Sequence, residues 1–203
     1  MNVTSIEKVS SNSNKVYVDG EFAFILSKSE LSRLNIMEGL ELDQMFLDAV
    51  EEEIVKKKAK KYVLYLLEQM DRSKEQLREK LKYKYYKDHV IEEALAYAQS
   101  FGYIDDTRLA TNFINSRKES KSKKEIYQLL VQKKLSKDII DAAFEEMYEE
   151  KDEIHAISHI ASKKGYTFEG KDYKEKQKIV AYFVRKGFSY DKVYHVLQVE
   201  EIS

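Results

Sequence analysis

The chain has 203 residues, of which 43% are hydrophobic, and its 35 Lys and Arg nearly balance its 36 Asp and Glu. This length is enough for one large or two small domains with real cores. Cysteine and proline are both absent, which excludes a disulfide framework, a thiolate metal site and a cysteine nucleophile. Because the N-terminus lacks an apolar signal segment and no run of about 18 apolar residues occurs, we expect a cytoplasmic protein without a membrane segment.

The charges are unevenly distributed along the chain. Residues 55–134 carry 20 Lys or Arg against 11 Asp or Glu, whereas the rest of the chain carries 15 against 25. A local field, more than the total charge, attracts phosphate, so the basic middle favours an anionic partner. The alternative is that these charges only keep an exposed helical surface soluble.

Strand signals occur only at the start of the chain. Residues 16–26 contain two β-rich runs joined by Asp19-Gly20, a dipeptide that accepts the positive φ of a two-residue hairpin turn. A hairpin with two partly apolar faces needs something to pack against, and residues 3–9 are the candidate third strand. The predicted pairs are Val18 with Glu21, Tyr17 with Phe22, and Val16 with Ala23.

Helical signals follow the hairpin. Ser27 and Glu30 form a capping box, and Gly39 suits the position just beyond the end of that short helix. From Asp43 onward, apolar residues keep helical spacing as far as Met70, which predicts one long helix.

The rest of the chain is repetitive. The stretch 73–95 is written again 49 residues later, and a third copy follows after a further 53 residues. Apolar character is kept at equivalent positions, and only Lys192 breaks the apolar register of the third copy. Units of this kind bury their apolar faces by stacking on their neighbours. The predicted starts of the central helices are Ser73, Ser122 and Asp172, each followed three residues later by Gln or Glu.

These patterns predict an all-α fold of three tandem three-helix repeats, preceded by a small amino-terminal β-hairpin or meander. The predicted segments are 1–42 for the hairpin and short helix, 43–105 for the linking helix and repeat 1, 106–152 for repeat 2, and 153–203 for repeat 3.

Catalytic chemistry is not indicated. The six glycines form no nucleotide-binding loop. His155 and His159 share a helix face, but they lack the glutamate of a metalloprotease motif and a third ligand. Asp105 and Asp106 are better explained as caps of the next helix, and the acidic run 145–153 as a solvated helix face. We expect no catalytic residue, no metal and no cofactor.

Two stretches suit binding to nucleic acid. Lysines alternate with tyrosines over residues 82–87, and such a pattern lets cations follow the backbone while aromatic rings stack on bases. Tyr86 aligns with apolar repeat positions and is expected in the core, which leaves Tyr83 and Tyr85 as candidates, with simple packing as the alternative. The second stretch surrounds the helix start at Ser122, where lysines oppose the helix dipole at a cost on the order of a few tenths of a kcal/mol.

Four motifs occur in order along the chain: Arg72-Ser73-x-x-Gln76-Leu77-x-x-x-Leu81; Gly102-Tyr103-Ile104-Asp105-Asp106; Arg117 followed by Lys124-x-Ile126-x-x-x-Leu130; and Arg185-Lys186-Gly187-Phe188-Ser189-Tyr190-Asp191. Their order and spacing resemble the RecX family of bacterial RecA regulators. The likeness covers residues 55–200, and the hairpin resembles the amino-terminal extension of RecX proteins from Gram-positive bacteria. Family members often have glycine where this chain has Lys121 and Lys134, so another conformation must close the chain there.

The resemblance implies a curved array of repeats that binds the RecA nucleoprotein filament along its groove, restrains homologous recombination, and binds single- or double-stranded DNA. It implies no enzyme activity, and we expect a monomer. A sequence-independent DNA-binding protein and a helical-repeat scaffold for another protein are the alternatives. The residues expected to contact filament or DNA, on the concave basic face, are Arg72, Lys74, Arg78, Lys82, Tyr83, Arg117, Lys118, Lys121, Lys123, Lys124, Arg185 and Lys186.

Overall fold

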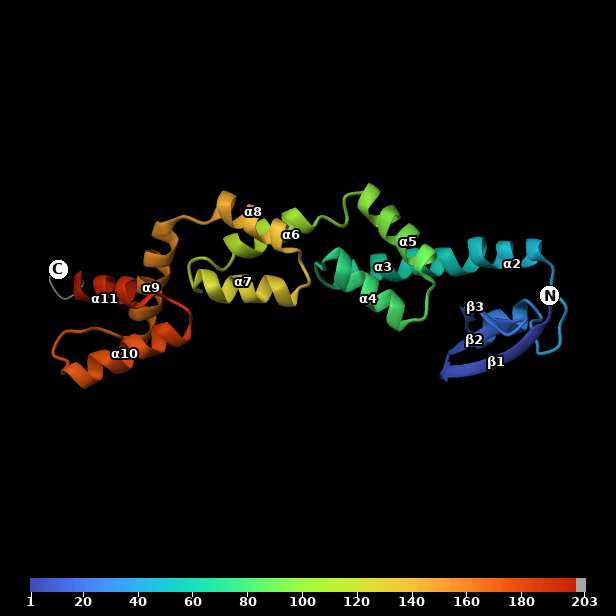
Figure 1. Ribbon diagram of the computed structural model, residues 1–203, viewed down its shortest axis with the longest axis horizontal. Helices are drawn as coiled ribbons and strands as arrows, with labels where there is room; N and C mark the ends of the chain where they lie inside the picture. The colour runs from blue at the N-terminus through green and yellow to red at the C-terminus, as the bar shows by residue number, and fades with distance from the viewer. Residues whose placement is uncertain (200–203) are drawn as a thin grey trace. The chain divides into compact units, whose positions relative to one another are not determined.

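The computed structural model describes residues 1–199 (Figure 1). The chain divides into two compact units, the first ending at Asp105 and the second beginning at Asp106. Apart from one small amino-terminal sheet, the regular elements of the described residues are helices, so the predicted fold class is confirmed. Within this range, no helix combines the length and apolar character needed to cross a bilayer.

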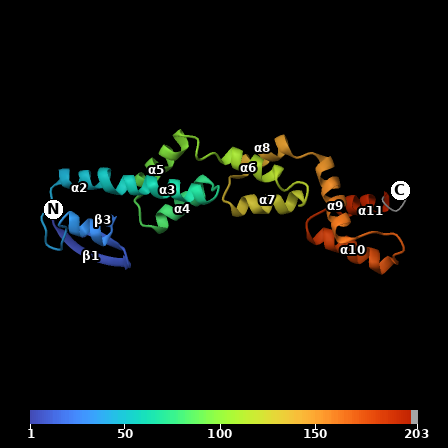
Figure 2. The ribbon, with the colours of Figure 1, turned by 180° about the vertical axis from the view of Figure 1, so that it is seen from behind.

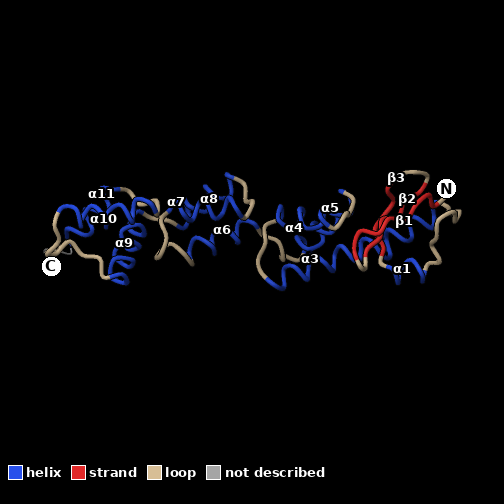
Figure 3. The backbone as a smooth tube through the Cα atoms, turned by 90° about the horizontal axis from the view of Figure 1, so that it is seen from below, coloured by secondary structure: helices blue, strands red, loops and turns tan. Residues whose placement is uncertain are grey.

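Three antiparallel strands form the sheet, in the order β1-β2-β3 (Figure 3). They are β1 (Val3–Ser10), β2 (Ser13–Val18) and β3 (Glu21–Leu26). The candidate third strand is therefore present as β1. Asp19 and Gly20 have φ values of 49° and 83°, the positive values that a two-residue hairpin turn requires.

One predicted strand pair is wrong. Val16 pairs with Phe24 instead of Ala23, while the two pairs nearer the turn are as predicted. Ala23 is an extra residue in the strand and forms a β-bulge. The bulge places the larger Phe24, only 4% exposed, opposite the fully buried Val16, so the core face gains a phenyl ring in place of a methyl group.

The first helix, α1 (Lys28–Arg33), starts at the predicted capping box of Ser27 and Glu30. Its predicted end at Gly39 is wrong. Asn35 instead takes the left-handed conformation just after the helix, with φ of 52°, because asparagine tolerates this region better than most residues.

The predicted long helix is present as three consecutive segments, capped by the Asp43 side chain, which accepts from the N–H of Phe46 at 2.7 Å. They are α2 (Gln44–Val50), the π-helical segment η1 (Glu51–Lys56) and α3 (Lys57–Gln69). Figure 2 shows α2 and α3 in line. The wider π turn has no counterpart in the sequence prediction.

A single hydrophobic core runs through the first unit, from Val3 to Ile104. It joins residues of the sheet, such as Leu26, to the long helix and to the next two helices. These are α4 (Lys74–Tyr83), which begins at the predicted Ser73 cap, and α5 (Asp88–Ser100). The amino-terminal sheet thus covers the long helix and shares its core.

The second unit contains two three-helix groups, each with its own hydrophobic cluster. The first group comprises α6 (Asp106–Asn115), α7 (Lys123–Gln132) and α8 (Lys137–Met147). The second comprises α9 (Glu150–Lys164), α10 (Tyr173–Arg185) and α11 (Tyr190–Val199).

The acidic run 145–153 is divided between α8 and α9, so its interpretation as one solvated helix face is wrong. Asp152 is only 7% exposed, and its carboxylate accepts from the N–H of Glu149 at 2.8 Å. Glu153 accepts from Lys192 Nζ at 2.8 Å. The lysine that breaks the apolar register of the third copy is therefore held in an ion pair.

The same left-handed turn follows α4, α7 and α10. Tyr85, Lys134 and Gly187 occupy equivalent positions, with φ of 62°, 63° and 92°. Lys134 thus adopts by itself the conformation for which glycine is usual. In each turn the next residue donates its N–H to a carbonyl in the helix, as in a Schellman motif. The three bonds are Tyr86 to Leu81, Leu135 to Leu130, and Phe188 to Phe183.

Tyr86 contributes to the core, as the sequence predicts. Burial, and after it the nearby Glu30 carboxylate, raises the pKa of its hydroxyl to about 12.

The shared core predicts a large effect of Leu26→Ala. Leu26 is fully buried, and its truncation leaves a cavity that we expect to lower the free energy of unfolding by about 2–5 kcal/mol. Urea denaturation measures this change. Met45→Ala on α2 is the control, because Met45 is 78% exposed and should change stability by less than about 0.5 kcal/mol. Similar small effects of both substitutions would contradict a common core of sheet and helices.

Candidate nucleic-acid interface

The predicted contact residues fall into two groups, one in each compact unit. Arg72 and the residues on α4 lie in the first unit, and those from Arg117 onward lie in the second.

Three cationic residues of the first group form a stripe on the side of α4 that faces α5. Lys74, Arg78 and Lys82 are spaced four residues apart, which places them on one side of the helix. Their nitrogens lie 2.9, 2.7 and 3.4 Å from oxygens on α5. The partners are Gln99, Glu92 and Asp88. This stripe therefore joins two helices of the same unit.

Arg78 is the most strongly engaged of these cations. Its Nε and Nη2 donate to the two carboxylate oxygens of Glu92 at 2.7 and 3.0 Å, and it also pairs with Glu75. The hydrogen bonds from the guanidinium lower the pKa of Glu92. The positive charge of Arg78 is thus largely compensated within its own unit.

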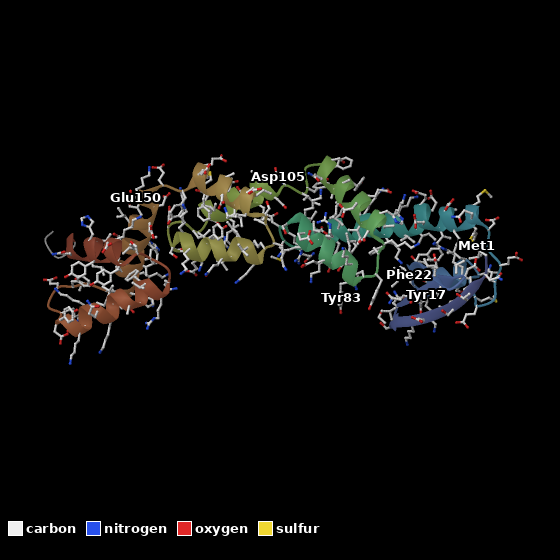
Figure 4. The ribbon with its side chains drawn as sticks, in the orientation of Figure 1. Met1, Tyr17, Phe22, Tyr83, Asp105 and Glu150 are labelled. Carbon is white, nitrogen blue, oxygen red and sulfur yellow. The ribbon has the colours of Figure 1, made fainter. Side chains whose placement is uncertain are left out.

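The remaining residues of the first group differ in exposure. Arg72 is half-buried, and its Nε has no hydrogen-bond partner among the described residues. Tyr83 is 78% exposed and extends from the end of α4 (Figure 4). Tyr85, the other candidate tyrosine, lies beneath Lys15 Nζ, 3.9 Å from its ring centroid. Tyr83 is thus the more accessible of the two rings for stacking.

Three cations of the second group pack on their own repeat. Arg117, Lys118 and Lys121 precede α7. Their partners are the Phe113 ring, 3.8 Å from the guanidinium carbon; the Met147 carbonyl, 3.2 Å from Nζ; and the Glu125 carboxylate. Lys118 also lies 3.5 Å from Asp152. These contacts stabilise the turn that leads into α7.

The start of α7 meets the end of α10 at a buried serine. Ser122 has no exposed surface, and its Oγ accepts from the N–H of Glu125 at 3.1 Å as the helix cap. The same hydroxyl donates to the Lys186 carbonyl at 2.5 Å. Lys123 and Lys124 are thereby brought to Arg185 and Lys186 of the next repeat. We call these four residues the basic junction.

Glycine is required on the α10 side of this contact. Gly187 has φ of 92°, and a Cβ there would lie 2.9 Å from Ser122 Oγ and 3.0 Å from Lys124 Cβ. In the sequence, Gly187 stands out only as part of the motif from Arg185 to Asp191. The close approach of α7, which also requires glycine at this position, becomes visible only in the structure.

The basic junction differs in its ion pairing from four of the other predicted cations. Lys123 Nζ lies 5.2 Å from the Phe144 ring centroid, and Lys186 Nζ lies 5.6 Å from that of Tyr182. Within residues 1–199, none of the four side chains is paired with a carboxylate. Arg78, Lys82, Lys118 and Lys121 all are.

A shallow hollow of 510 Å³ opens beside the junction. It brings two lysines together with an aromatic ring and an amide, a set that suits phosphate and an unpaired base. The Glu153 carboxylate also lines the hollow, and its charge is balanced by Lys192 Nζ at 2.8 Å. Tyr127 and Gln128 were missed from sequence, because periodicity alone does not show which exposed face of α7 meets another repeat. The lining residues are Lys123, Lys124, Tyr127, Gln128, Glu153 and Gly187.

Over the described part of the chain, no group of three or more His, Asp or Glu side chains is placed to hold a metal ion. His155 and His159 are exposed on α9.

Comparisons with known proteins point to one family. Residues 151–197 match the third three-helix domain of RecX. Regulatory protein RecX of Caldanaerobacter subterraneus subsp. tengcongensis is 28% identical over 96% of this chain and 96% of its own. Regulatory protein RecX of Clostridium perfringens (strain SM101) is 29% identical over 93% and 91%.

Two solved structures share the fold. The crystal structure of a regulatory protein RecX aligns with a TM-score of 0.62 at 24% identity, over 96% of this chain and 98% of the other. RecX from Lactobacillus salivarius aligns with a TM-score of 0.60 at 20% identity, over 73% and 97%.

The contact between α7 and α10 predicts unequal effects of two glycine substitutions. Gly187→Ala and Gly170→Ala both place alanine at positive φ, at a cost of about 1–2 kcal/mol each. Only Gly187 has neighbours within 4 Å, so overpacking should add a further ~1–3 kcal/mol there. Thermal unfolding of both variants measures the difference. Equal losses would show that α7 and the turn at Gly187 do not meet closely.

Proposed function

We propose that the chain is a RecX-type regulatory protein, as its likeness to RecX relatives supports, and that it binds RecA nucleoprotein filaments through the basic junction and inhibits them. The observation that carries the proposal is the gathering of Lys123, Lys124, Arg185 and Lys186 from two repeats, without a carboxylate partner among the described residues. Like charges held together repel one another, and an anionic partner relieves that repulsion.

The chemistry of the junction suits the phosphate backbone or acidic side chains of a filament. Lysine and arginine that neutralise phosphates release condensed counterions, so binding of this kind weakens steeply with salt. The dipole of α7 adds a favourable potential for an anion at the same end. Tyr127 and Gln128 in the hollow can add stacking and hydrogen bonds to an exposed base.

Inhibition follows from holding the filament in one state. The basic junction joins two repeats through the Ser122–Lys186 hydrogen bond, so one bound molecule can contact successive filament subunits. A ligand that binds one conformation of the filament better than another shifts the population toward it. This mechanism requires no catalytic group, no cofactor and no second copy of the chain.

A second candidate function is binding to single-stranded DNA without RecA. The exposed Tyr83 favours it, since its ring lies among lysines at the end of α4 and is free to stack on a base. Here the partner would be DNA alone, and the residues involved would include the first unit.

The first test measures RecA ATP hydrolysis on single-stranded DNA with and without a modest excess of this protein, at two salt concentrations. We expect suppressed hydrolysis that weakens as salt rises, because electrostatic contacts are screened. Binding to the DNA alone, measured in parallel, separates the two candidate functions. No suppression at any protein ratio would contradict the filament proposal.

The second test reverses the charge of the junction. We expect Lys123→Glu with Lys124→Glu to weaken filament binding at least about tenfold and to lower the slope of log K against log salt by about two. Filament binding followed by fluorescence anisotropy measures both.

The matched control for this test is Lys174→Glu with Lys178→Glu, two exposed lysines in the amino-terminal half of α10. It makes the same change of net charge and should leave binding unchanged. Equal loss in both variants, or full inhibition by the junction variant, would show that the junction is not the contact surface.

A further inference from the structure

The outer edge of β3 lies beside an open groove in the first unit. A hollow of 380 Å³ is lined by residues of β3 and of α2, and Figure 1 shows β3 as the strand nearest to α2. Because the strand order is β1-β2-β3, β3 has a strand partner on one side only. The groove runs along the side of β3 that has no strand partner.

The protein protects one edge of this sheet and leaves the other open. At the β1 edge, the N–H of Val3 donates to the Leu40 carbonyl at 2.9 Å, and the N–H of Ile6 donates to the Glu38 carboxylate at 2.8 Å. For residues 21–25 of β3, no described residue outside the sheet forms a hydrogen bond with the backbone. Unpaired strand edges are templates for another strand, and proteins usually cover them.

The walls of the groove have a defined chemistry. Phe22 and Leu47 supply apolar surface, and Phe22 packs against Tyr17 on the sheet (Figure 4), with ring centroids 5.9 Å apart. Glu21 and Asp48 are exposed at the rim. This combination suits a segment that alternates apolar and basic side chains.

The electrostatic balance of the lining supports the same conclusion. Four carboxylates face one lysine and the N-terminal amine: Asp19, Glu21, Asp48 and Glu51 against Lys87 and Met1. Glu51 bonds to His89 at 2.8 Å and begins the π-helical segment η1. Such wide turns occur frequently at functional sites.

We propose that this groove binds an extended, basic segment of a partner protein, which adds to the sheet as a fourth strand beside β3. The backbone of the segment would pair with the open edge, its lysines or arginines would face Glu21 and Asp48, and its apolar side chains would face Phe22 and Leu47. The groove lies in the first unit and its charge is opposite to that of the basic junction, so the inference is independent of the proposed function.

The test uses the full chain and a fluorescein-labelled peptide of alternating lysine and valine with blocked ends, followed by fluorescence anisotropy. We expect binding that weakens about tenfold or more when all the peptide amides are N-methylated, because neither edge of the peptide can then donate to the edge of β3. The same peptide with glutamate in place of lysine should not bind, because its charges repel the groove.

A pair of charge-reversal variants locates the site. Glu21→Lys with Asp48→Lys should weaken binding of the lysine–valine peptide about tenfold. Glu145→Lys with Glu146→Lys, exposed on α8, makes the same charge change elsewhere and should leave binding intact. Circular dichroism confirms that both variants are folded.

Three results would overturn the proposal. The first is no binding of the lysine peptide. The second is binding that is insensitive to N-methylation or lost equally in both variants, which would indicate general charge attraction. The third is self-association in sedimentation that Glu21→Lys with Asp48→Lys abolishes, since a second copy would then occupy the groove.

Discussion

The left-handed turn after α4, α7 and α10 is the constraint that organises the repeats, because it returns the chain so that the next helix can pack on the previous one. Tyr85 and Lys134 adopt it at a cost of about 1–2 kcal/mol each relative to glycine. At the third turn this option does not exist. Ser122 and Lys124 approach Gly187 so closely that any side chain would collide with them. The neighbouring repeat, more than the turn itself, decides which residue is allowed.

That close approach also explains why some cations are available for binding and others are not. The hydroxyl of Ser122 bonds to the Lys186 carbonyl, and this contact gathers lysines and an arginine from two repeats without pairing them to a carboxylate of the described residues. On α4, the same residue types meet an acidic face of α5, where Arg78 forms two hydrogen bonds with Glu92. Similar sequence patterns therefore serve stability in one place and leave charge available in another.

Local features of the fold were predictable from sequence, and features that depend on a distant neighbour were not. The Ser27 and Ser73 caps are encoded within four residues, and so is the turn at Asp19-Gly20. The bulge at Ala23 depends on which residue the core can accommodate opposite Val16. The ion pairs on α4 depend on the rotation of α5, which helical spacing does not give. For the same reason, the twelve residues predicted to contact filament or DNA included both ion-paired and unpaired cations.

The amino-terminal sheet illustrates how a covering element can acquire a surface of its own. Leu26 and its neighbours bury the apolar side of the long helix, and this burial fixes β3 next to α2. The loop after α1 closes the β1 edge through Leu40 and Glu38, but no described residue outside the sheet forms a hydrogen bond with the backbone of residues 21–25 of β3. An open edge with an acidic rim disfavours acidic or neutral strands and still accepts a basic one. Charge at Glu21 and Asp48 therefore restricts which partner can pair with an edge that the fold itself leaves open.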